Sequence, residues 1–265
     1  MPKISIIMGI YNCAPYLKEA IDSIQKQTFS DWELIMCDDG SDDETYNIAQ
    51  SYAERDNRIE LLKNDSNMGL SVTLNRCLAV ARADIIARMD GDDISLPERL
   101  EKEFSFLELH PEFSVVSCPM IQFDEKGVFR SGRGEYEVLP KDFPKGPPIG
   151  HAPSMFRKKA FDDVGGYSED KRVLRVEDRD LCLKLILRGH RMYVIDECLY
   201  MVRDGNEAYH RRKYKYRANC ARIIAKSIRK LKLPVYNYIY VLRPLVVGLL
   251  PKPIYDRLHK GKRDN

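Results

Sequence analysis

The sequence predicts an α/β fold: a mostly parallel sheet with helices on both faces, followed by a basic helical extension. Three observations support this. The chain has 265 residues, enough for one large α/β domain with or without an appendage. Between residues 4 and 110, short apolar runs alternate with segments of helical periodicity. Such a βαβα order implies parallel strands joined by right-handed crossovers.

The first part of the chain contains the regular alternation. Asn12 is expected to cap the first helix, since Pro15 falls in its first turn. Ile85–Met89 is expected to be a short buried strand, and acidic residues follow it directly. The expected strands are 4–8, 32–37, 59–62, 85–89 and 115–118, with helices near 13–25, 43–54, 71–81 and 97–110.

Beyond residue 119 the alternation breaks down. A hairpin is expected over 120–123 and 127–130, and the Gly- and Pro-rich residues 131–150 are expected to loop over a site. Further strands are expected at 152–156, 191–195 and 199–202, and helices at 158–164, 176–188 and 210–232. The chain thus divides into residues 1–118, 119–209 and 210–265.

Composition is typical of a soluble protein, with 44% hydrophobic and 31% charged residues. The 7 cysteines are scattered and include no C-x-x-C pair. This favours a reducing cytoplasm over a disulfide framework or a zinc site. The apolar run at residues 4–8 is too short for a signal peptide and is expected to be a strand.

Charge is distributed unevenly along the chain. Residues 210–265 hold 16 Lys and Arg against two acids, whereas residues 1–209 hold 27 against 38. The segment 236–255 is apolar, but Arg243, Pro244 and Pro251 interrupt it too often for a membrane span. We expect the tail to lie on an anionic membrane leaflet. A solvated helix packed on the domain is the alternative, and nucleic acid is a weaker one because no recognition motif accompanies the charge.

The acidic turn Asp90-Gly91-Asp92-Asp93 is the strongest candidate site. It follows an apolar strand, at the sheet edge where α/β proteins bind ligands. Three neighbouring carboxylates repel one another unless a cation lies among them. Gly91 would let a ligand approach the backbone. A solvated acidic turn is the alternative.

Two other strands also end in polar residues, namely Ile10-Tyr11-Asn12 and Asp38-Asp39. These ends are expected to line one cleft with the acidic turn. Neither G-x-G-x-x-G nor G-x-x-x-x-G-K-[ST] occurs where a dinucleotide or phosphate loop would need it. Acids in place of a glycine-rich loop suit a metal-bridged diphosphate and hydrogen bonds to a nucleobase.

Several spaced motifs together resemble a family 2 glycosyltransferase of the GT-A fold, a Rossmann-like architecture, from Ile4 to about Arg203. They are SIIMGIYN (5–12), DDGSDD (38–43), NMG (67–69), ARMDGDD (87–93), LPERL (96–100) and VEDRDLCLKL (176–185). The resemblance makes residues 1–118 the nucleotide-sugar-binding half and 119–209 the acceptor-binding, catalytic half. It implies an inverting enzyme of bacterial surface-polysaccharide synthesis.

The resemblance also implies roles on the donor side. Ile10, Tyr11 and Asn12 would border the nucleotide, and Asp39 would hydrogen-bond the base, usually uracil. Asp92 would bind Mn²⁺ or Mg²⁺, which neutralises the departing diphosphate. Further donor-side residues would be Asn67 and Gly69 at the nucleotide pocket, Asp90 near the ribose or a metal-bound water, and Gly91.

On the acceptor side, Asp178 matches the general base, which would take the proton of the acceptor hydroxyl. Glu177 would bind acceptor hydroxyls. Without the resemblance, both acids are better explained as N-terminal helix residues that stabilise the helix dipole. His151 lies in a loop expected near the donor sugar and acceptor, or is merely packed there.

Two arginines have open roles. Arg88 precedes the acids and would pair with them or with the diphosphate. Arg203 stands where many relatives carry a metal-binding histidine; an arginine does not ligate a cation but does pair with phosphate. The resemblance therefore does not supply this metal ligand, and a surface arginine is the alternative.

The expected reaction moves a hexose or N-acetylhexosamine from a UDP-sugar to a hydroxyl of a saccharide or lipid-linked saccharide. It would take place in the cytoplasm, at the inner face of a bacterial membrane. A haloacid-dehalogenase-like phosphatase is one alternative, although its Asp-x-Asp motif usually opens the domain. A non-catalytic nucleotide-sugar or lipid-binding module is the other. The sequence identifies neither the sugar nor the acceptor.

Overall fold

A sheet of eight strands forms the centre of the computed structural model, which describes residues 1–132, 134–203 and 214–249. The strand order is β3-β2-β1-β4-β10-β6-β11-β9. The strands are β1 (Ile4–Ile10), β2 (Trp32–Asp38), β3 (Ile59–Lys63), β4 (Ile85–Asp90), β6 (Phe113–Ser117), β9 (Tyr136–Glu137), β10 (Met155–Arg157) and β11 (Arg191–Val194).

The sheet is mostly parallel, as predicted. β1 pairs in parallel with both β2 and β4, and its end residues Gly9 and Ile10 lie opposite Asp90 and Asp38. Only the short strands β10 and β9 run antiparallel to their neighbours. The carboxyl ends of β1, β2 and β4 therefore meet at one edge, which gathers the polar residues that follow them.

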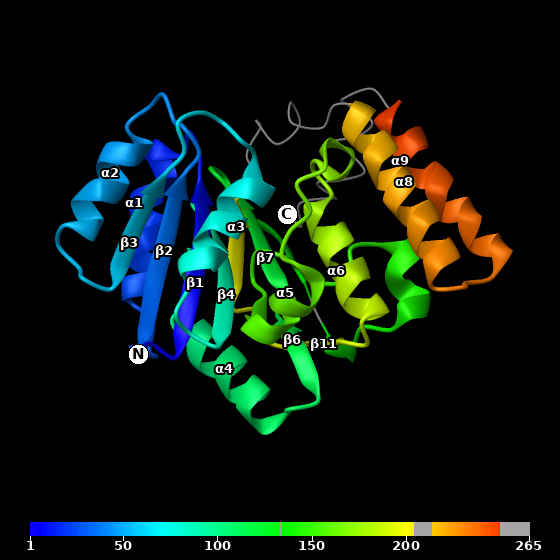
Figure 1. Ribbon diagram of the computed structural model, residues 1–265, viewed down its shortest axis with the longest axis horizontal. Helices are drawn as coiled ribbons and strands as arrows, with labels where there is room; N and C mark the ends of the chain where they lie inside the picture. The colour runs from blue at the N-terminus through cyan, green and yellow to red at the C-terminus, as the bar shows by residue number, and fades with distance from the viewer. Residues whose placement is uncertain (133, 204–213, 250–265) are drawn as a thin grey trace.

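Helices cover both faces of this sheet (Figure 1). One face packs against α1 (Ala14–Gln25), α2 (Thr45–Ala53) and α4 (Arg99–Leu109). The other packs against α3 (Leu70–Val80), α5 (Lys158–Val164) and α6 (Glu177–Leu187). Alternation along β1 explains this, because Ile6 and Met8 join the first core while Ile7 joins the second.

A second sheet of four strands lies beside the acidic turn. Its order is β5-β12-β7-β8. The strands are β5 (Ile94–Ser95), β7 (Met120–Asp124), β8 (Gly127–Ser131) and β12 (Tyr200–Arg203). The predicted hairpin corresponds to β7 and β8. β12 pairs with β5, so the end of β12 returns next to the residues that follow β4.

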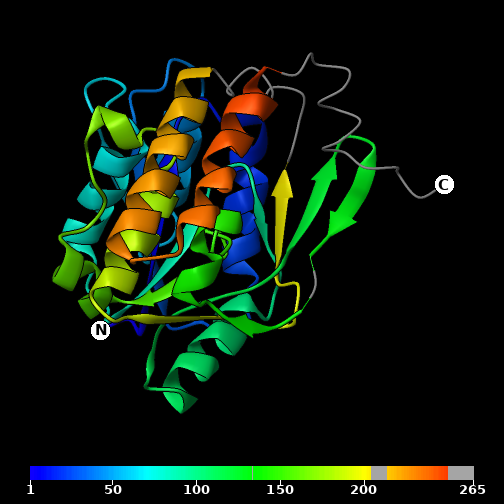
Figure 2. The same ribbon diagram turned by 90° about the vertical axis from the view of Figure 1, so that its right-hand side faces the viewer.

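The described chain closes with a helical hairpin at one edge of the molecule. It comprises α8 (Tyr214–Lys230), the short 3₁₀ segment η3 (Val235–Tyr238) and α9 (Ile239–Gly248). Figure 2 shows α8 and α9 side by side in front of the domain. The predicted basic helix is confirmed over residues 214–230, whereas residues 210–213 and 250–265 lie outside the described chain. Within the described residues, no helix combines the length and apolarity needed to cross a bilayer.

Three local predictions were wrong. Asn12 does not cap α1, which begins at Ala14; its side chain instead accepts the backbone N–H of Asp42. The strand expected from residue 152 begins at Met155, since Pro153 has no N–H for a ladder bond. Residues 131–150 include β9 and the 3₁₀ segment η1 (Pro140–Lys145), so they are not one open loop. A second 3₁₀ segment, η2 (Lys171–Val173), precedes α6.

Candidate active site

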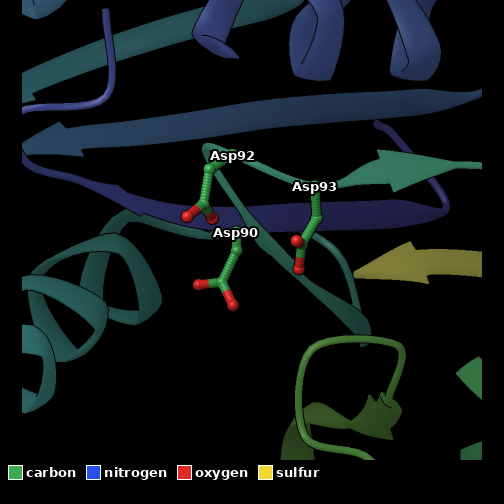
Figure 3. A group of neighbouring side chains, drawn as sticks. All are labelled: Asp90, Asp92 and Asp93. Atoms are coloured by element: carbon green, nitrogen blue, oxygen red, sulfur yellow. The ribbon is translucent and has the colours of Figure 1, made fainter. Parts of the chain in front are cut away.

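The acidic turn after β4 brings three carboxylates together. Asp90, Asp92 and Asp93 each place an oxygen within 4.8 Å of the others, and Figure 3 shows the three groups gathered around the turn. Gly91 permits this turn, because a Cβ there would lie 2.8 Å from Cγ2 of Ile10. Sequence analysis chose Asp90 and Asp92 as metal ligands; the structure adds Asp93 to the cluster.

Asp93 is the buried member of the cluster. Its side chain is 3% exposed, and Oδ1 accepts the backbone N–H of Arg203 at 2.8 Å. Burial raises its pKa well above the usual range, and the charges of Asp90 and Asp92 raise it further. Excess negative charge is therefore concentrated in this turn, and an oxygen-liganded cation would relieve it.

Arg203 supports the turn from β12. Its Nε donates to the carbonyl of Asp92 at 3.0 Å, and its guanidinium pairs with Glu19 on α1. The guanidinium also lies 4.4 and 4.5 Å from the ring centroids of Tyr16 and Phe123. These contacts hold the acidic turn in place. A role at a phosphate stays a prediction, and it would require rearrangement of the pair with Glu19.

Arg88 is the central cation of the site. It lies on β4, its side chain is 3% exposed, and it forms an ion pair with Asp90. Its Nε and Nη1 are buried without a hydrogen-bond partner among the described residues. An unpaired buried N–H is costly, so these two groups are suited to receive a ligand oxygen. Sequence analysis placed Arg88 beside the acids or the diphosphate, and the structure shows the first contact.

The predicted base Asp178 lies in the first turn of α6, next to Glu177. Burial raises the pKa of Asp178 above the ordinary aspartate range, while the N–H of Arg179, at 2.7 Å from Oδ1, and the charges of Arg179 and then Arg88 lower it. Arg88 thus acts electrostatically on both Asp90 and Asp178. Burial and the charge of Asp178 raise the pKa of Glu177. A carboxylate of raised pKa is suited to accept a proton.

His151 lies in the same neighbourhood. Its Nε2 and the hydroxyl of Tyr167 are 2.8 Å apart. Burial, and then the positive charge of Arg88, lower its pKa well below the usual range, so the ring is neutral near pH 7. Asn75 on α3 fixes Tyr167 by bonding both its backbone N–H and its carbonyl. The structure therefore brings His151 close to Arg88 but does not test its role at an acceptor.

Asp39, at the end of β2, is held by the loop before α3. Its Oδ1 accepts from Asn64 at 2.6 Å and from the N–H of Met68 at 2.8 Å, and its Oδ2 accepts from the N–H of Gly69 at 2.8 Å. Gly69 has φ +92°, which favours glycine. Because a carboxylate has about four acceptor positions, one remains for a nucleobase. Asp39 and Gly69 are thus brought together, whereas Asn67 is exposed beside them.

The loop after β1 borders the same region. The carbonyl of Ile10 accepts the N–H of Asp39 at 2.9 Å, and Asn12, at φ +47°, donates its N–H to Ser41. Tyr11 is 46% exposed next to them. These bonds tie the ends of β1 and β2 into one rim, as predicted from their shared polar endings.

Sequence analysis missed the buried residues that hold the backbone of β4 and of the acidic turn in place. The hydroxyl of Tyr200 accepts the N–H of Asp90 at 3.1 Å. Arg99 is fully buried, donates to the carbonyls of Arg88 and Ala152, and stacks on Tyr200 at 4.9 Å. Arg99 belongs to the LPERL motif, but nothing in that motif indicates what its side chain contacts.

The assembled groups have the chemistry of a cation-assisted transfer site. Three carboxylates provide the oxygen donors that Mg²⁺ and Mn²⁺ prefer, and Arg88 neutralises only part of their charge. Asp178 is the candidate base, and the positive charge of Arg88 lowers its pKa. Arg88 is therefore paired with one acid of the turn and also lowers the pKa of the predicted base.

Comparison with solved structures supports the same fold. The chain resembles TarS (residues 1–349) of S. aureus in complex with UDP, with a TM-score of 0.68, 21% identity, and coverage of 97% of this chain and 73% of that one. It resembles the mannosyltransferase PcManGT of Pyrobaculum calidifontis, in complex with GDP-Man and Mn²⁺, equally well: the TM-score is 0.68 at 19% identity, covering 97% and 78% of the two chains. Both likenesses indicate the GT-A fold.

Sequence relatives give the family. The putative glycosyltransferase EpsE of Bacillus subtilis (strain 168) is 44% identical over 98% of this chain and 94% of its own length. The O-antigen biosynthesis glycosyltransferase WbnJ of Escherichia coli is 30% identical over 90% and 93%. The family model for glycosyl transferase family 2 matches residues 5–165. The phosphatase alternative is thereby set aside, and the chain belongs to glycosyl transferase family 2.

Proposed function

We propose that this chain is an inverting, metal-dependent glycosyltransferase that moves a hexose or N-acetylhexosamine from a UDP-sugar to a hydroxyl of a saccharide or lipid-linked saccharide. The observation that carries the proposal is Arg88, which pairs with Asp90 and acts on Asp178. A donor bound at the acidic turn would thus lie near Arg88, whose charge also reaches the predicted base Asp178.

The donor side would hold the nucleotide diphosphate. Asp39 would accept a hydrogen bond from the base, and Asp90, Asp92 and Asp93 would hold Mn²⁺ or Mg²⁺. The cation would supply Lewis-acid stabilisation of the leaving diphosphate. Arg88 would donate its two unpartnered N–H groups to ligand oxygens. The TarS structures with UDP and UDP-GlcNAc, and PcManGT with GDP-Man and Mn²⁺, support a nucleotide-sugar donor.

The acceptor side would move one proton. Asp178 would take it from the acceptor hydroxyl as that oxygen attacks the anomeric carbon opposite the diphosphate, which inverts the configuration. Glu177 would orient the acceptor, and neutral His151 would hydrogen-bond a sugar hydroxyl. We assign these roles to residues 119–209 and the nucleotide to residues 1–118.

The product would be a bacterial surface polysaccharide such as a capsule, an O-antigen or an exopolysaccharide. Relatives named for O-antigen and amylovoran biosynthesis support this class. An acceptor anchored in lipid would place the enzyme in the cytoplasm, peripheral on the inner face of the cell membrane. The basic C-terminal segment supports that location, and we assign it no nucleic-acid partner.

Release of UDP from UDP-sugars in the presence of Mn²⁺ tests the proposal, with Asp92→Asn and Asp178→Asn as variants. Asp84→Asn is the matched control, since Asp84 is an exposed residue preceding the other end of β4. We expect Asp92→Asn to lose metal-dependent UDP binding and Asp178→Asn to bind UDP without turnover. Metal-dependent binding with no turnover of any acceptor by the unsubstituted chain would favour a non-catalytic binding module instead.

A further inference from the structure

The outer face of the C-terminal hairpin exposes an unusual set of apolar side chains. Elsewhere in the described chain, exposed large apolar residues are scattered over separate elements. On η3, on α9 and at the residue that ends α9, six of them follow one another at helical spacing, with 54% to 80% of each side chain exposed: Val235, Tyr236, Ile239, Leu242, Val246 and Leu249. A contiguous apolar surface of this kind marks a binding face.

A cationic row runs along the neighbouring helix. The inner side of α8 is buried on the domain through Ile223, Ile224 and Ile228. Its exposed side carries Lys215, Arg222, Arg229 and Lys230. Residues 214–249 contain eight Lys and Arg and no Asp or Glu. α8 and α9 lie side by side at the same edge (Figure 2), so the helix with the exposed cationic residues is next to the one with the exposed apolar residues.

We infer that this outer face of α8 and α9 is the surface by which the protein docks on an anionic lipid leaflet. An apolar row beside a cationic row is the composition of a helix that lies in the bilayer interface. A second copy is disfavoured, because facing hairpins would bring two cationic rows together. The acidic balance of residues 1–209 would turn the remainder of the molecule away from the leaflet.

The hairpin is bonded to the segment that carries the acceptor acids. Asn219 donates to the carbonyl of Leu174 at 3.0 Å, and Lys226 pairs with Asp180 at 2.9 Å. Arg179 contacts Sγ of Cys220 at 3.2 Å. These contacts lie on both sides of Glu177 and Asp178. If Glu177 and Asp178 serve the acceptor, as the proposed function has it, then docking would hold the acceptor side of the site one helix layer from the membrane.

Co-sedimentation of the full chain with vesicles tests the inference. We expect pelleting with vesicles of phosphatidylcholine and phosphatidylglycerol, weakened by salt, and little pelleting with phosphatidylcholine alone. The apolar variant Leu242→Glu/Val246→Glu and the charge variant Arg229→Glu/Lys230→Glu should each lower the partition coefficient by roughly tenfold or more. Each variant is first shown to keep the thermal unfolding transition of the unsubstituted chain.

Two matched pairs serve as controls. Leu109→Glu/Val128→Glu changes apolar residues that are 76% and 60% exposed elsewhere, and Lys126→Glu/Lys141→Glu changes exposed lysines outside the hairpin. Both should pellet like the unsubstituted chain. The inference is overturned if all variants pellet equally. It is also overturned if the chain ignores vesicles but forms a dimer by light scattering, binds DNA, or binds an acidic protein through this face. No donor or acceptor is present, so the result is independent of transferase activity.

Discussion

The two sides of the site hold their carboxylates in different ways. On the donor side, Asp39 is fixed by backbone N–H groups of Met68 and Gly69, from a loop that follows the adjacent strand β3. On the acceptor side, Asp178 accepts the N–H of Arg179 on its own helix; burial raises its pKa, while this bond and the charges of Arg179 and Arg88 lower it. The first arrangement holds the carboxylate in one position. The second leaves it basic, which is what a proton acceptor requires.

The largest expected effect comes from removing the base. Asp178→Asn should lower the turnover number about 10²- to 10⁴-fold, the range of general-base catalysis, because an amide does not take the acceptor proton. Affinity for UDP should not change, since the residue lies on the acceptor side. Turnover assays and calorimetry with UDP measure the two quantities. A variant that keeps normal turnover would remove the distinction between the two sides.

The next effect concerns the donor side. In Asp39→Asn one of the two backbone N–H groups bonded to Asp39 loses its acceptor, because the amide nitrogen is a donor. We expect a loss of about 2 kcal/mol in the free energy of unfolding, the size of a hydrogen bond to a charged group. Chemical denaturation measures it, with the exposed Asp42→Asn as control. Equal stabilities would show that the carboxylate is not needed to order this loop.

A third prediction probes the residue that joins the two sides. Arg88 lowers the pKa of Asp178, so Arg88→Met should raise that pKa further. The base acts in its unprotonated form, and activity is therefore lost as pH falls through this pKa. The acidic limb of the pH–rate profile should move to higher pH, with activity at neutral pH reduced about tenfold for the lost charge-assisted contact. The exposed Lys159→Met is the control. If the acidic limb does not move, the charge of Arg88 does not affect the pKa of the base.

The smallest effect tests the docking of α8 on the acceptor side. Among the described residues, Lys226→Met leaves the buried Asp180 with only the hydroxyl of Ser168 as side-chain donor, at 2.6 Å. Lys226 is 42% exposed, so solvent weakens the pair, and we expect a loss of about 1 kcal/mol in the free energy of unfolding. The exposed Lys215→Met should have no such effect. Equal unfolding free energies would mean that this ion pair does not stabilise the hairpin on α6.

The same contrast explains how much the sequence could predict. The donor half was predictable because short strands, crossover helices and polar strand ends are local patterns, and parallel pairing then brings Asp39 and Asp90 to one edge. The order of the second sheet was not, since β12 pairs with β5 and β7 across long separations in the chain. The sequence did not point to Arg99, Tyr167 and Tyr200, because their roles depend on burial and on hydrogen-bond partners that only the folded structure shows. For Arg203 the residue type suggested a phosphate ligand, whereas its pair with Glu19 depends on how β12 meets α1.

The most direct test of the account is a crystal structure of the chain with a UDP-sugar and Mn²⁺, with the anomalous signal of manganese recorded. The account predicts a peak bonded to the diphosphate and to a carboxylate of the turn at Asp90, Asp92 and Asp93, with the anomeric carbon facing Asp178. Manganese bound elsewhere, or a sugar that faces away from Asp178, would contradict it.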